Sequence, residues 1–399
     1  MTVPLDGIWE IPLWITWLQA FLKTSIKDLD LSVNIRVIDL SRKPFQDFNP
    51  QEYFNGDELS DLYIFSPLLQ NYDLTQKVAD FLREKGTKVA IGGVMSSFVD
   101  PMRFDYVFTG RIEQNYPSFL SIISDVYQVR TPVIEFSFSR FEKHISYEWA
   151  KHYVNRVIYL RLFTQFGCPL NCSFCSDRRT GVDIVPLNIV EKELQELHKT
   201  FPAMDVLYIG DLTFGVNKYA IEYLEKILVN LKQKFRIEYK LIIQTNPSLI
   251  SQPFLDELKR LNVKVIEMGI ESGSVTSVKR LNKKRPSTEW LESRIHLILK
   301  NDIGVAGNII VGLPDDQEED YFGTIEWINK WKEKIWFNLY GYVPYFNTPL
   351  YQRLKQDDRI RNWNFSDWCE GKELVFEPYN ISRSRVREFF LEVLNQSIK

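Results

Sequence analysis

The chain has 399 residues, which is long for one ordinary domain and typical of two. Hydrophobic residues make up 45% of it and charged residues 25%, the composition of a globular protein with a sizeable core. The net charge of −3 leaves no basic footprint for nucleic acid, and a total of four cysteines excludes a disulfide-rich secreted framework.

The first residues show no targeting signal, because MTVPLDGIWEIPLW lacks a basic region and a cleavage site. The apolar stretch from Ile11 to Leu22 is interrupted by Thr16 and Gln19 and is too short to cross a bilayer. We therefore expect a cytoplasmic protein that has no membrane partner.

Residues 1–125 alternate short apolar runs with segments of helical period. We expect strands at residues 33–40, 61–66, 88–92 and 105–109, and helices at residues 13–24 and 74–85. Strands that alternate with helices predict an α/β domain, here a Rossmann-like, doubly wound parallel sheet. Residues 126–156 are irregular, and we expect them to form a connector.

A second and longer series of strand–helix units begins at residue 157. We expect strands at residues 157–163, 206–209, 239–244, 264–268, 307–311 and 336–342, and helices at residues 190–200, 220–234, 252–261, 288–300 and 318–331. Six such units predict an open or partial barrel over residues 157–352, with its site at the carboxyl ends of the strands. Residues 353–399 are expected to be a short helical C-terminal segment with a helix at residues 384–397.

Three of the four cysteines lie in FGCPLNCSFC, residues 166–175, after the first strand of the second series. A disulfide would leave one thiol over, and structural zinc sites need four ligands, usually as two separated pairs. The fourth cysteine, Cys369, is distant in sequence, and no histidine lies close to the group. Thiolates at Cys168, Cys172 and Cys175 fit an iron–sulfur cubane whose fourth iron lacks a protein ligand, so an exogenous ligand is expected there.

The spacing C-x3-C-x2-C, with the aromatic Phe174 before the last cysteine, resembles the radical S-adenosylmethionine (radical SAM) superfamily. The resemblance implies a partial (β/α)6 barrel and a 4Fe–4S cluster on the three cysteines, with SAM chelating the open iron through its amino and carboxylate groups. It further implies cleavage of SAM to a 5′-deoxyadenosyl radical that takes hydrogen from a substrate. An external electron donor, flavodoxin or ferredoxin, would then be a partner.

Other stretches match the superfamily in order along the chain. Gly210 and Asp211 follow the second barrel strand, where the family has a glycine-rich or acidic motif that faces the SAM amino group. Glu271 in MGIESGS resembles the family's acidic residue that contacts the SAM ribose. The resemblance also implies contacts near adenine for Phe174, Ile309, Gly312 and Pro314. Gln244 stands where many relatives carry a basic residue near the SAM carboxylate, so how that group is held stays open. Each residue also has a structural interpretation, such as a helix cap at Glu271 or close packing at a glycine.

Residues 100–120, DPMRFDYVFTGRIEQNYPSFL, resemble the end of the cobalamin-binding domain that precedes some radical SAM barrels, and Gly92-Gly93 matches a preceding strand end. No histidine comes before His144, so the Asp-x-His-x-x-Gly signature that supplies an imidazole to cobalt is missing, and the opening strand is nearly absent. Two interpretations stay open. The domain binds cobalamin as a cofactor, or it is degenerate and docks a substrate or a small partner protein.

Several reactions compete for this arrangement. The first is hydrogen abstraction from a peptide during maturation of a ribosomally made natural product (RiPP), including excision of part of a residue. The alternative is cobalamin-dependent methylation of a small metabolite or peptide. tRNA methylthiolation is disfavoured, because that branch carries cysteines in its N-terminal domain and none precedes residue 168 here. A non-catalytic iron–sulfur scaffold is the remaining class.

Three residues are candidates for catalysis on the substrate side. Tyr342 and Tyr345, in NLYGYVPYFNTPLY, lie near where a substrate would enter the barrel. Cys369 is a candidate for quenching a radical or donating hydrogen, although a buried thiol is the usual role of a free cysteine. With one cysteine after residue 175, the chain is limited to a single cluster.

Overall fold

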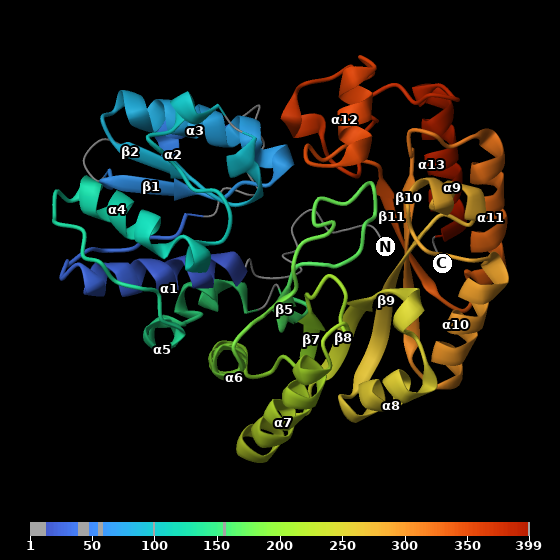
Figure 1. Cartoon of the computed structure of the whole chain (residues 1–399), viewed down its shortest axis with the longest axis horizontal. Helices are drawn as coiled ribbons and strands as arrows, with labels where there is room; N and C mark the ends of the chain where they lie inside the picture. The colour runs from blue at the N-terminus through green and yellow to red at the C-terminus, as the bar shows by residue number, and fades with distance from the viewer. Residues whose placement is uncertain (1–12, 39–47, 55–58, 99, 155–156, 398–399) are drawn as a thin grey trace. The chain divides into compact units, whose positions relative to one another are not determined.

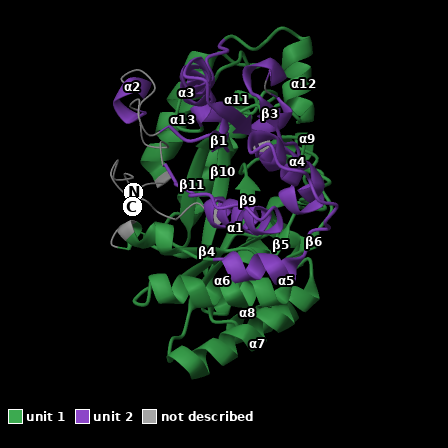
Figure 2. Ribbon diagram, turned by 90° about the vertical axis from the view of Figure 1, so that its left-hand side faces the viewer, with its two compact units in different colours: residues 1–13, 146–361, 370–399 green, residues 14–145, 362–369 purple. Residues whose placement is uncertain are grey.

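The computed structural model describes residues 13–38, 48–54, 59–98, 100–154 and 157–397. Figure 2 distinguishes two compact units, which we call the N-terminal unit (residues 14–145 and 362–369) and the barrel unit (residues 1–13, 146–361 and 370–399). The expected connector, residues 126–156, is divided between them after residue 145. The chain also returns to the N-terminal unit late in the sequence.

The N-terminal unit is built on a parallel sheet, as the alternating pattern predicts. Its strands β1 (Leu62–Phe65), β2 (Lys88–Ile91) and β3 (Tyr106–Val107) pair in that order. Its helices are α1 (Leu13–Asp28), α2 (Pro50–Tyr53), α3 (Tyr72–Glu84), α4 (Tyr116–Val126) and α5 (Phe138–Phe141). Val89, Ala90 and Ile91 of the central strand are fully buried, because a parallel strand with a neighbour on each side lies in the core.

The strand expected at residues 33–40 is wrong over its described part, residues 33–38. The apolar alternation is present, since Val33, Ile35 and Val37 are half-buried and the residues between them are exposed. However, no described strand pairs with this segment, and a β-strand requires a hydrogen-bonded neighbour. Residues 39 and 40 lie outside the described residues.

Residues 362–369, which we call the clasp, complete the N-terminal unit from the far end of the sequence. Asp73 of α3 accepts a hydrogen bond of 2.8 Å from the backbone N–H of Ser366, and the Phe365 ring meets Tyr72 edge-on at 5.8 Å. Trp368 is 1% exposed. The hydrogen-bonded partners are 293 residues apart in sequence, so no local pattern predicts this contact.

The barrel unit confirms the expected series of six parallel strands. They are β4 (Leu160–Leu162), β7 (Val206–Ile209), β8 (Lys240–Thr245), β9 (Val263–Glu271), β10 (Gly304–Val311) and β11 (Trp336–Gly341), each paired with the next. The helices between them are α6 (Leu187–Thr200), α7 (Lys218–Phe235), α8 (Gln252–Arg260), α9 (Val275–Arg280), α10 (Thr288–Lys300) and α11 (Glu318–Trp331). Figure 1 shows α7, α8, α10 and α11 on the outside of the sheet. Among the described residues β4 and β11 do not pair, so the barrel is open and partial.

Alternate residues of each barrel strand face the helices or the inner side of the sheet. Along β10, Val305, Ile309 and Val311 are buried toward the helices, whereas Ala306 and Asn308, on the other face, are half-buried. The inner face of the barrel is therefore the more accessible one.

The C-terminal segment is helical, as expected, with α12 (Pro349–Gln356) and α13 (Arg383–Ser397). The rings of Tyr321 on α11 and Phe389 on α13 stack with centroids 4.6 Å apart. Gly312, just after β10, has a φ of +91°, and a Cβ there would lie 2.8 Å from the Leu374 side chain. Glycine is therefore needed where the C-terminal segment covers the end of β10.

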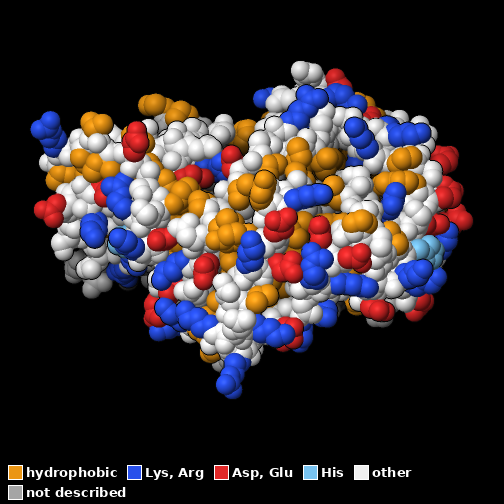
Figure 3. Space-filling model, turned by 60° about the horizontal axis from the view of Figure 1, so that its bottom comes forward, with side chains coloured by type: hydrophobic (Ala, Val, Ile, Leu, Met, Phe, Trp, Pro, Cys, Tyr) orange, Lys and Arg blue, Asp and Glu red, His pale blue; other side chains and the backbone are white. Residues whose placement is uncertain are grey.

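The surface carries both signs of charge. Figure 3 shows Lys and Arg side chains interspersed with Asp and Glu on the face displayed, in keeping with the near balance of 49 basic and 52 acidic residues. No helix within the described part of the chain has the length and apolar character needed to cross a membrane.

Candidate functional site

The cysteine-bearing loop leaves β4 and is closed at its base. Strands β5 (Gln165–Phe166) and β6 (Asp183–Ile184) pair antiparallel at the two ends of the loop. Gly167 has a φ of +85°, and a Cβ on it would lie 1.9 Å from the carbonyl oxygen of Gly181. The backbone N–H of Cys168 donates to Thr180 Oγ1 at 2.8 Å. Residues 167–181 therefore form a loop held shut by backbone contacts that only glycine at position 167 permits.

The three loop cysteines are free and close enough to affect one another. Cys168 and Cys172 are 8% and 9% exposed, and Cys175 is half-buried. Burial raises the pKa of Cys172, and it raises the pKa of Cys175 to about 12, with neighbouring cysteines adding repulsion in both cases. Thiolates here therefore need a cationic centre to stabilise them.

Three thiols on one loop have the chemistry of iron–sulfur cluster ligands. In an iron–sulfur cubane each cysteine ligates a different iron, so the sulfurs do not have to meet at one point. The Sγ atom of Cys168 also lies 3.4 Å from Thr213 Oγ1, a contact that orients this thiol.

Asp211 supports the start of the cysteine loop. It is fully buried, and its carboxylate accepts hydrogen bonds from the backbone N–H of Thr164 at 2.7 Å and of Gln165 at 3.2 Å, and from the Thr164 hydroxyl. Burial raises the pKa of Asp211 to about 6. Its neighbour Gly210 leaves room for Phe163, since a Cβ there would come within 2.7 Å of that ring. Both residues are thus occupied with positioning β4 and the loop after it.

Glu271 lies at the carboxyl end of β9 in a buried ion pair. Its φ is +65°, and its Oε1 lies 2.5 Å from Lys283 Nζ, which also donates to the Gly269 carbonyl at 2.7 Å. Lys283 lowers the pKa of Cys172 and Glu271 raises it, so the pair lies within electrostatic range of the cysteine loop. A Cβ on Gly269 would be 2.2 Å from Oε1 and 2.5 Å from Nζ, so glycine makes the space for this pair.

Lys283 is the functional candidate that sequence reasoning missed. It follows α9 in LNKKRP, twelve residues after Glu271, and the sequence alone does not distinguish it from Lys284 beside it. In the structure Lys284 is exposed, whereas the Lys283 side chain is 10% exposed. Lys283 is thus a buried positive charge at the carboxyl end of β9.

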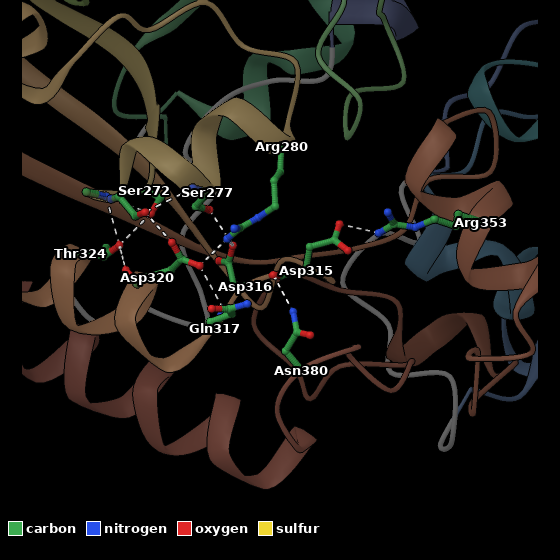
Figure 4. Close-up of polar contacts among 12 residues, drawn as sticks. Ser272, Ser277, Arg280, Asp315, Asp316, Gln317, Asp320, Thr324, Arg353 and Asn380 are labelled. Carbon is green, nitrogen blue, oxygen red and sulfur yellow. Dashed lines mark hydrogen bonds and ion pairs between the residues drawn. The ribbon is translucent and has the colours of Figure 1, made fainter.

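A polar network holds the backbone after Glu271, and Figure 4 shows most of it. Thr324 of α11 bonds the Ser272 hydroxyl at 2.8 Å and accepts from the Gly273 N–H at 3.0 Å. The carboxylate of Asp316 accepts from Ser277 at 2.6 Å and pairs with Arg280 at 3.2 Å. The turn after β9 is therefore fixed to α9 and to the start of α11.

Asp316 makes the stability of this network dependent on pH. Burial raises its pKa from 3.8 to about 7, so the folded chain keeps a proton that the unfolded chain releases across that interval. We expect the free energy of unfolding to decrease as the pH rises through this window, by up to about 1.4 kcal/mol per pH unit. Asp316→Asn should have a flatter profile in urea unfolding at a series of pH values. Equal slopes for the two proteins would contradict the assignment.

The loop is also tied to the rest of the barrel unit near Phe174. The backbone N–H of Ser173 donates to the Leu281 carbonyl at 2.9 Å, at the end of α9. Asn347, after β11, donates to the Ser176 carbonyl at 2.8 Å. Phe174 itself is half-buried between these two anchors in sequence. The cysteine loop is thus fixed on both of its flanks.

The remaining predicted cofactor contacts lie on β8 and β10. The Oε1 atom of Gln244 lies 3.4 Å from the Tyr208 hydroxyl oxygen. Ile309 is fully buried toward the helices, and Pro314 accepts at its carbonyl from the Tyr379 N–H at 2.9 Å.

The predicted substrate-side residues separate in the structure. Tyr342 is buried with its ring edge-on to Phe376 at 5.6 Å, and burial raises its pKa. Tyr345 donates from its hydroxyl to Glu370 at 3.2 Å. Cys369 ends the clasp and belongs to the N-terminal unit. Tyr342 therefore occupies a packing position, whereas Tyr345 keeps its hydroxyl in a polar contact.

Comparison with known proteins places this geometry among relatives. Residues 162–328 match the family model of the radical SAM superfamily. Bacteriochlorophyllide d C-12(1)-methyltransferase of Chlorobaculum tepidum is 23% identical over 345 residues, which cover 81% of this chain and 71% of the relative. The tRNA-2-methylthio-N(6)-dimethylallyladenosine synthase of Helicobacter pylori is 26% identical over 193 residues, 44% of this chain and 42% of that relative. The chain thus matches less than half the length of the synthase.

Two solved structures share the fold over most of the chain. The radical SAM methyltransferase TsrM from Kitasatospora setae, with tryptophan substrate and a SAM analogue bound, has a TM-score of 0.64 at 14% identity and covers 87% of this chain and 74% of its own. The cobalamin-dependent SAM radical enzyme OxsB, with aqua-cobalamin and SAM bound, has a TM-score of 0.67 at 14% identity and covers 98% of this chain and 64% of its own. At these identities the likeness shows the fold.

Proposed function

Because residues 162–328 are a radical SAM domain and the protein is a radical SAM enzyme, we propose that it catalyses cobalamin-dependent methylation of a small metabolite or peptide. The observation that supports this best is the methyltransferase relative that aligns with 81% of the chain. TsrM, which is itself a methyltransferase and has been solved with cobalamin and a 4Fe–4S cluster bound, shares the fold. These relatives support methylation better than the peptide maturation that the sequence favours.

We propose that Cys168, Cys172 and Cys175 ligate the 4Fe–4S cluster that the family uses. When bound, the cluster supplies an electron to SAM, and cobalamin supplies a cobalt centre that carries a methyl group. The chain's own part is to hold three thiols in a loop shut at Gly167, with a fourth iron left for SAM. An external donor such as flavodoxin or ferredoxin would reduce the cluster.

Lys283 and Glu271 are proposed to hold the polar parts of SAM. The buried ammonium of Lys283 lies within electrostatic range of Cys172, where a carboxylate chelating the open iron would need a positive partner. The Oε1 atom of Glu271 accepts from Lys283, and no hydrogen bond to its second oxygen is formed within the described part of the chain, so we propose that this oxygen accepts from a ribose hydroxyl. Asp211, Thr164 and Gln165 position the loop and are not proposed to touch SAM.

Cobalamin is proposed to bind at the carboxyl ends of the strands in the N-terminal unit, where open parallel sheets bind ligands. Gly93, after β2, has a φ of +77°, and Leu68, after β1, is 58% exposed, which gives close backbone and an apolar surface. The unit's histidine, His144, instead lines a cavity of 540 Å³ beside Lys23 and Lys27 of α1. We therefore propose that no imidazole of this edge ligates cobalt.

The test is the visible spectrum after reconstitution with hydroxocobalamin and gel filtration. We expect the chain to retain a corrinoid band, and Gly93→Ala to retain at least about tenfold less, because the added methyl group would stand at the strand end where the corrinoid is proposed to bind. Gly86→Ala is the matched control, since Gly86 has a similar φ of +83° and no atom within 4 Å of a Cβ. A wild-type chain without a corrinoid band would refute the cobalamin-dependent proposal.

A further inference from the structure

The inner face of the barrel carries a row of polar side chains, whereas closed barrels are usually filled with bulky apolar ones. Each of the six strands contributes a hydrogen-bonding side chain to it: Arg161, Tyr208, Gln244, Glu267, Asn308 and Asn338. These residues alternate along their strands with buried apolar residues that face the helices, such as Ile266 and Met268 beside Glu267. We call this set the inner polar layer. Such a layer is costly in a packed core and suits a site that receives a polar ligand.

Glu267 of β9 is the centre of the inner polar layer. Its Oε2 accepts from the Tyr208 hydroxyl and its Oε1 from Asn308 Nδ2, both at 2.8 Å. Asn338 Nδ2 then donates to Asn308 Oδ1 at 2.9 Å. These contacts join β7, β9, β10 and β11, so the four side chains must point toward one another across the inner face. They also fix the amide of Asn308 in one orientation.

The same contacts determine which groups remain for a ligand. Each carboxylate oxygen of Glu267 has one donor and can accept a second hydrogen bond. Asn338 turns its amide nitrogen toward Asn308, so its Oδ1 is left to accept on the other side. The centre of the inner polar layer therefore offers hydrogen-bond acceptors from Glu267 and Asn338. A ligand group that binds there must be a hydrogen-bond donor.

The two charged side chains of this layer, Glu267 and Arg161, do not form an ion pair with each other. Among the described residues no Lys or Arg forms an ion pair with Glu267, and the guanidinium of Arg161 lies instead over the Tyr208 ring at 4.6 Å. Burial, followed by repulsion from Glu267, raises the pKa of Tyr208 and of Tyr340, so the two phenols stay neutral. A half-buried carboxylate without a cationic partner is stabilised by a ligand cation.

Glu267 also lies in line with the proposed SAM contacts. It is four residues before Glu271 on β9, and Gly269 between them is where the Lys283–Glu271 pair sits. A strand advances about 3.3 Å per residue, and the Glu271 carboxylate lies over Gly269, so it is about 7 Å beyond Glu267 along the strand. A small molecule anchored on Glu267 would extend toward the cofactor side of the same face.

We propose that the inner polar layer is the substrate site and that it takes a small molecule whose buried end is a protonated amine, held by Glu267 and Asn338. This proposal rests on the proposed function. The amine donates to the oxygens that the network leaves open, and its charge pairs with the carboxylate. An amino acid, or the amine formed by its decarboxylation, is the class of substrate that this chemistry selects.

The experiment is equilibrium dialysis of the full chain, reconstituted with its cluster, against a defined mixture. The mixture contains the twenty common amino acids, their decarboxylated amines and the N-acetyl derivative of each compound, and retained compounds are quantified by mass spectrometry. We expect at least one free amine to be retained at least about tenfold more than its N-acetyl derivative. Glu267→Gln should reduce that retention at least about tenfold, whereas Glu238→Gln, at an exposed position, should not.

Three outcomes would overturn the proposal: no amine is retained, the N-acetyl derivative is retained equally, or Glu267→Gln retains as much as the wild type. Dialysis involves no turnover, so it is independent of the methylation test. A chain that retains amines through Glu267 but no corrinoid would refute the methyltransferase and support the amine site. A chain that retains corrinoid but no amine would do the reverse.

Discussion

Gly167→Ala is expected to abolish assembly of the iron–sulfur cluster, while Gly181→Ala leaves it intact. The φ of Gly167 is +85°, and an added Cβ would lie 1.9 Å from the Gly181 carbonyl oxygen, a backbone atom that cannot rotate away. The loop would have to open at its base, and the three thiols would lose their arrangement. A Cβ on Gly181 has no atom within 4 Å, so this glycine, on the other side of the same contact, is the matched control.

The measurement is iron content after anaerobic reconstitution. The wild type and Gly181→Ala should bind about four irons per chain, and Gly167→Ala less than about one. The variant with Cys168, Cys172 and Cys175 all replaced by alanine gives the iron content expected without a cluster. This variant should also form no 5′-deoxyadenosine with dithionite and SAM. Full iron content in Gly167→Ala would show that the closed loop is not required. Cleavage of SAM by the triple variant would refute the proposed ligands.

Lys283→Met is expected to weaken SAM binding about tenfold to hundredfold while iron content is kept, because a charged hydrogen bond contributes about 1.5–3 kcal/mol. The measurement is equilibrium binding of SAM to the reconstituted chain, with iron determined on the same sample. Lys284→Met is the control, since Lys284 is adjacent in sequence and exposed. Unchanged SAM affinity in Lys283→Met would remove this lysine from the site.

Two further variants separate binding from folding in this prediction. Removing Lys283 leaves Glu271 buried without its partner, which by itself destabilises a protein. The double variant Lys283→Met with Glu271→Gln removes both charges and should recover stability but not SAM binding. Gly269→Ala keeps both charges and displaces them, since its Cβ would lie 2.2 Å from Glu271 Oε1. Weak SAM binding in both variants, with normal iron, supports the pair as the site.

The bounds of several elements are predicted from the local sequence to within a single residue. β7, α10 and α11 span residues 206–209, 288–300 and 318–331, the bounds that their periodicity predicts. Caps explain the sharp helix starts: Ser287 accepts from the Trp290 N–H at 3.1 Å, and Gln317 and Asp320 form a capping box. The apolar periodicity and the caps both depend on residues only a few positions apart, so the sequence alone predicts them.

Features that depend on contacts between residues distant in the sequence could not be predicted from the sequence. Residues 33–38 carry the alternation of a strand, but pairing is decided by a neighbour that the described chain does not provide. The clasp depends on a contact across 293 residues. The family resemblance places Asp211 near the SAM amino group, and only the structure shows that its oxygens accept from Thr164 and Gln165. Side chains of one type can serve a ligand or the backbone, and only their neighbours in space decide between the two.

The sequence by itself determined the α/β class, the six parallel strands, the cysteine loop and its family, because spacing and periodicity act over short distances. The tertiary structure decided how that loop is closed at Gly167 and which of two adjacent lysines is buried against Glu271. It also gathered Tyr208, Glu267, Asn308 and Asn338 onto one inner face. Each of these depends on segments that are remote in sequence and adjacent in space, so folding was needed to bring their side chains together.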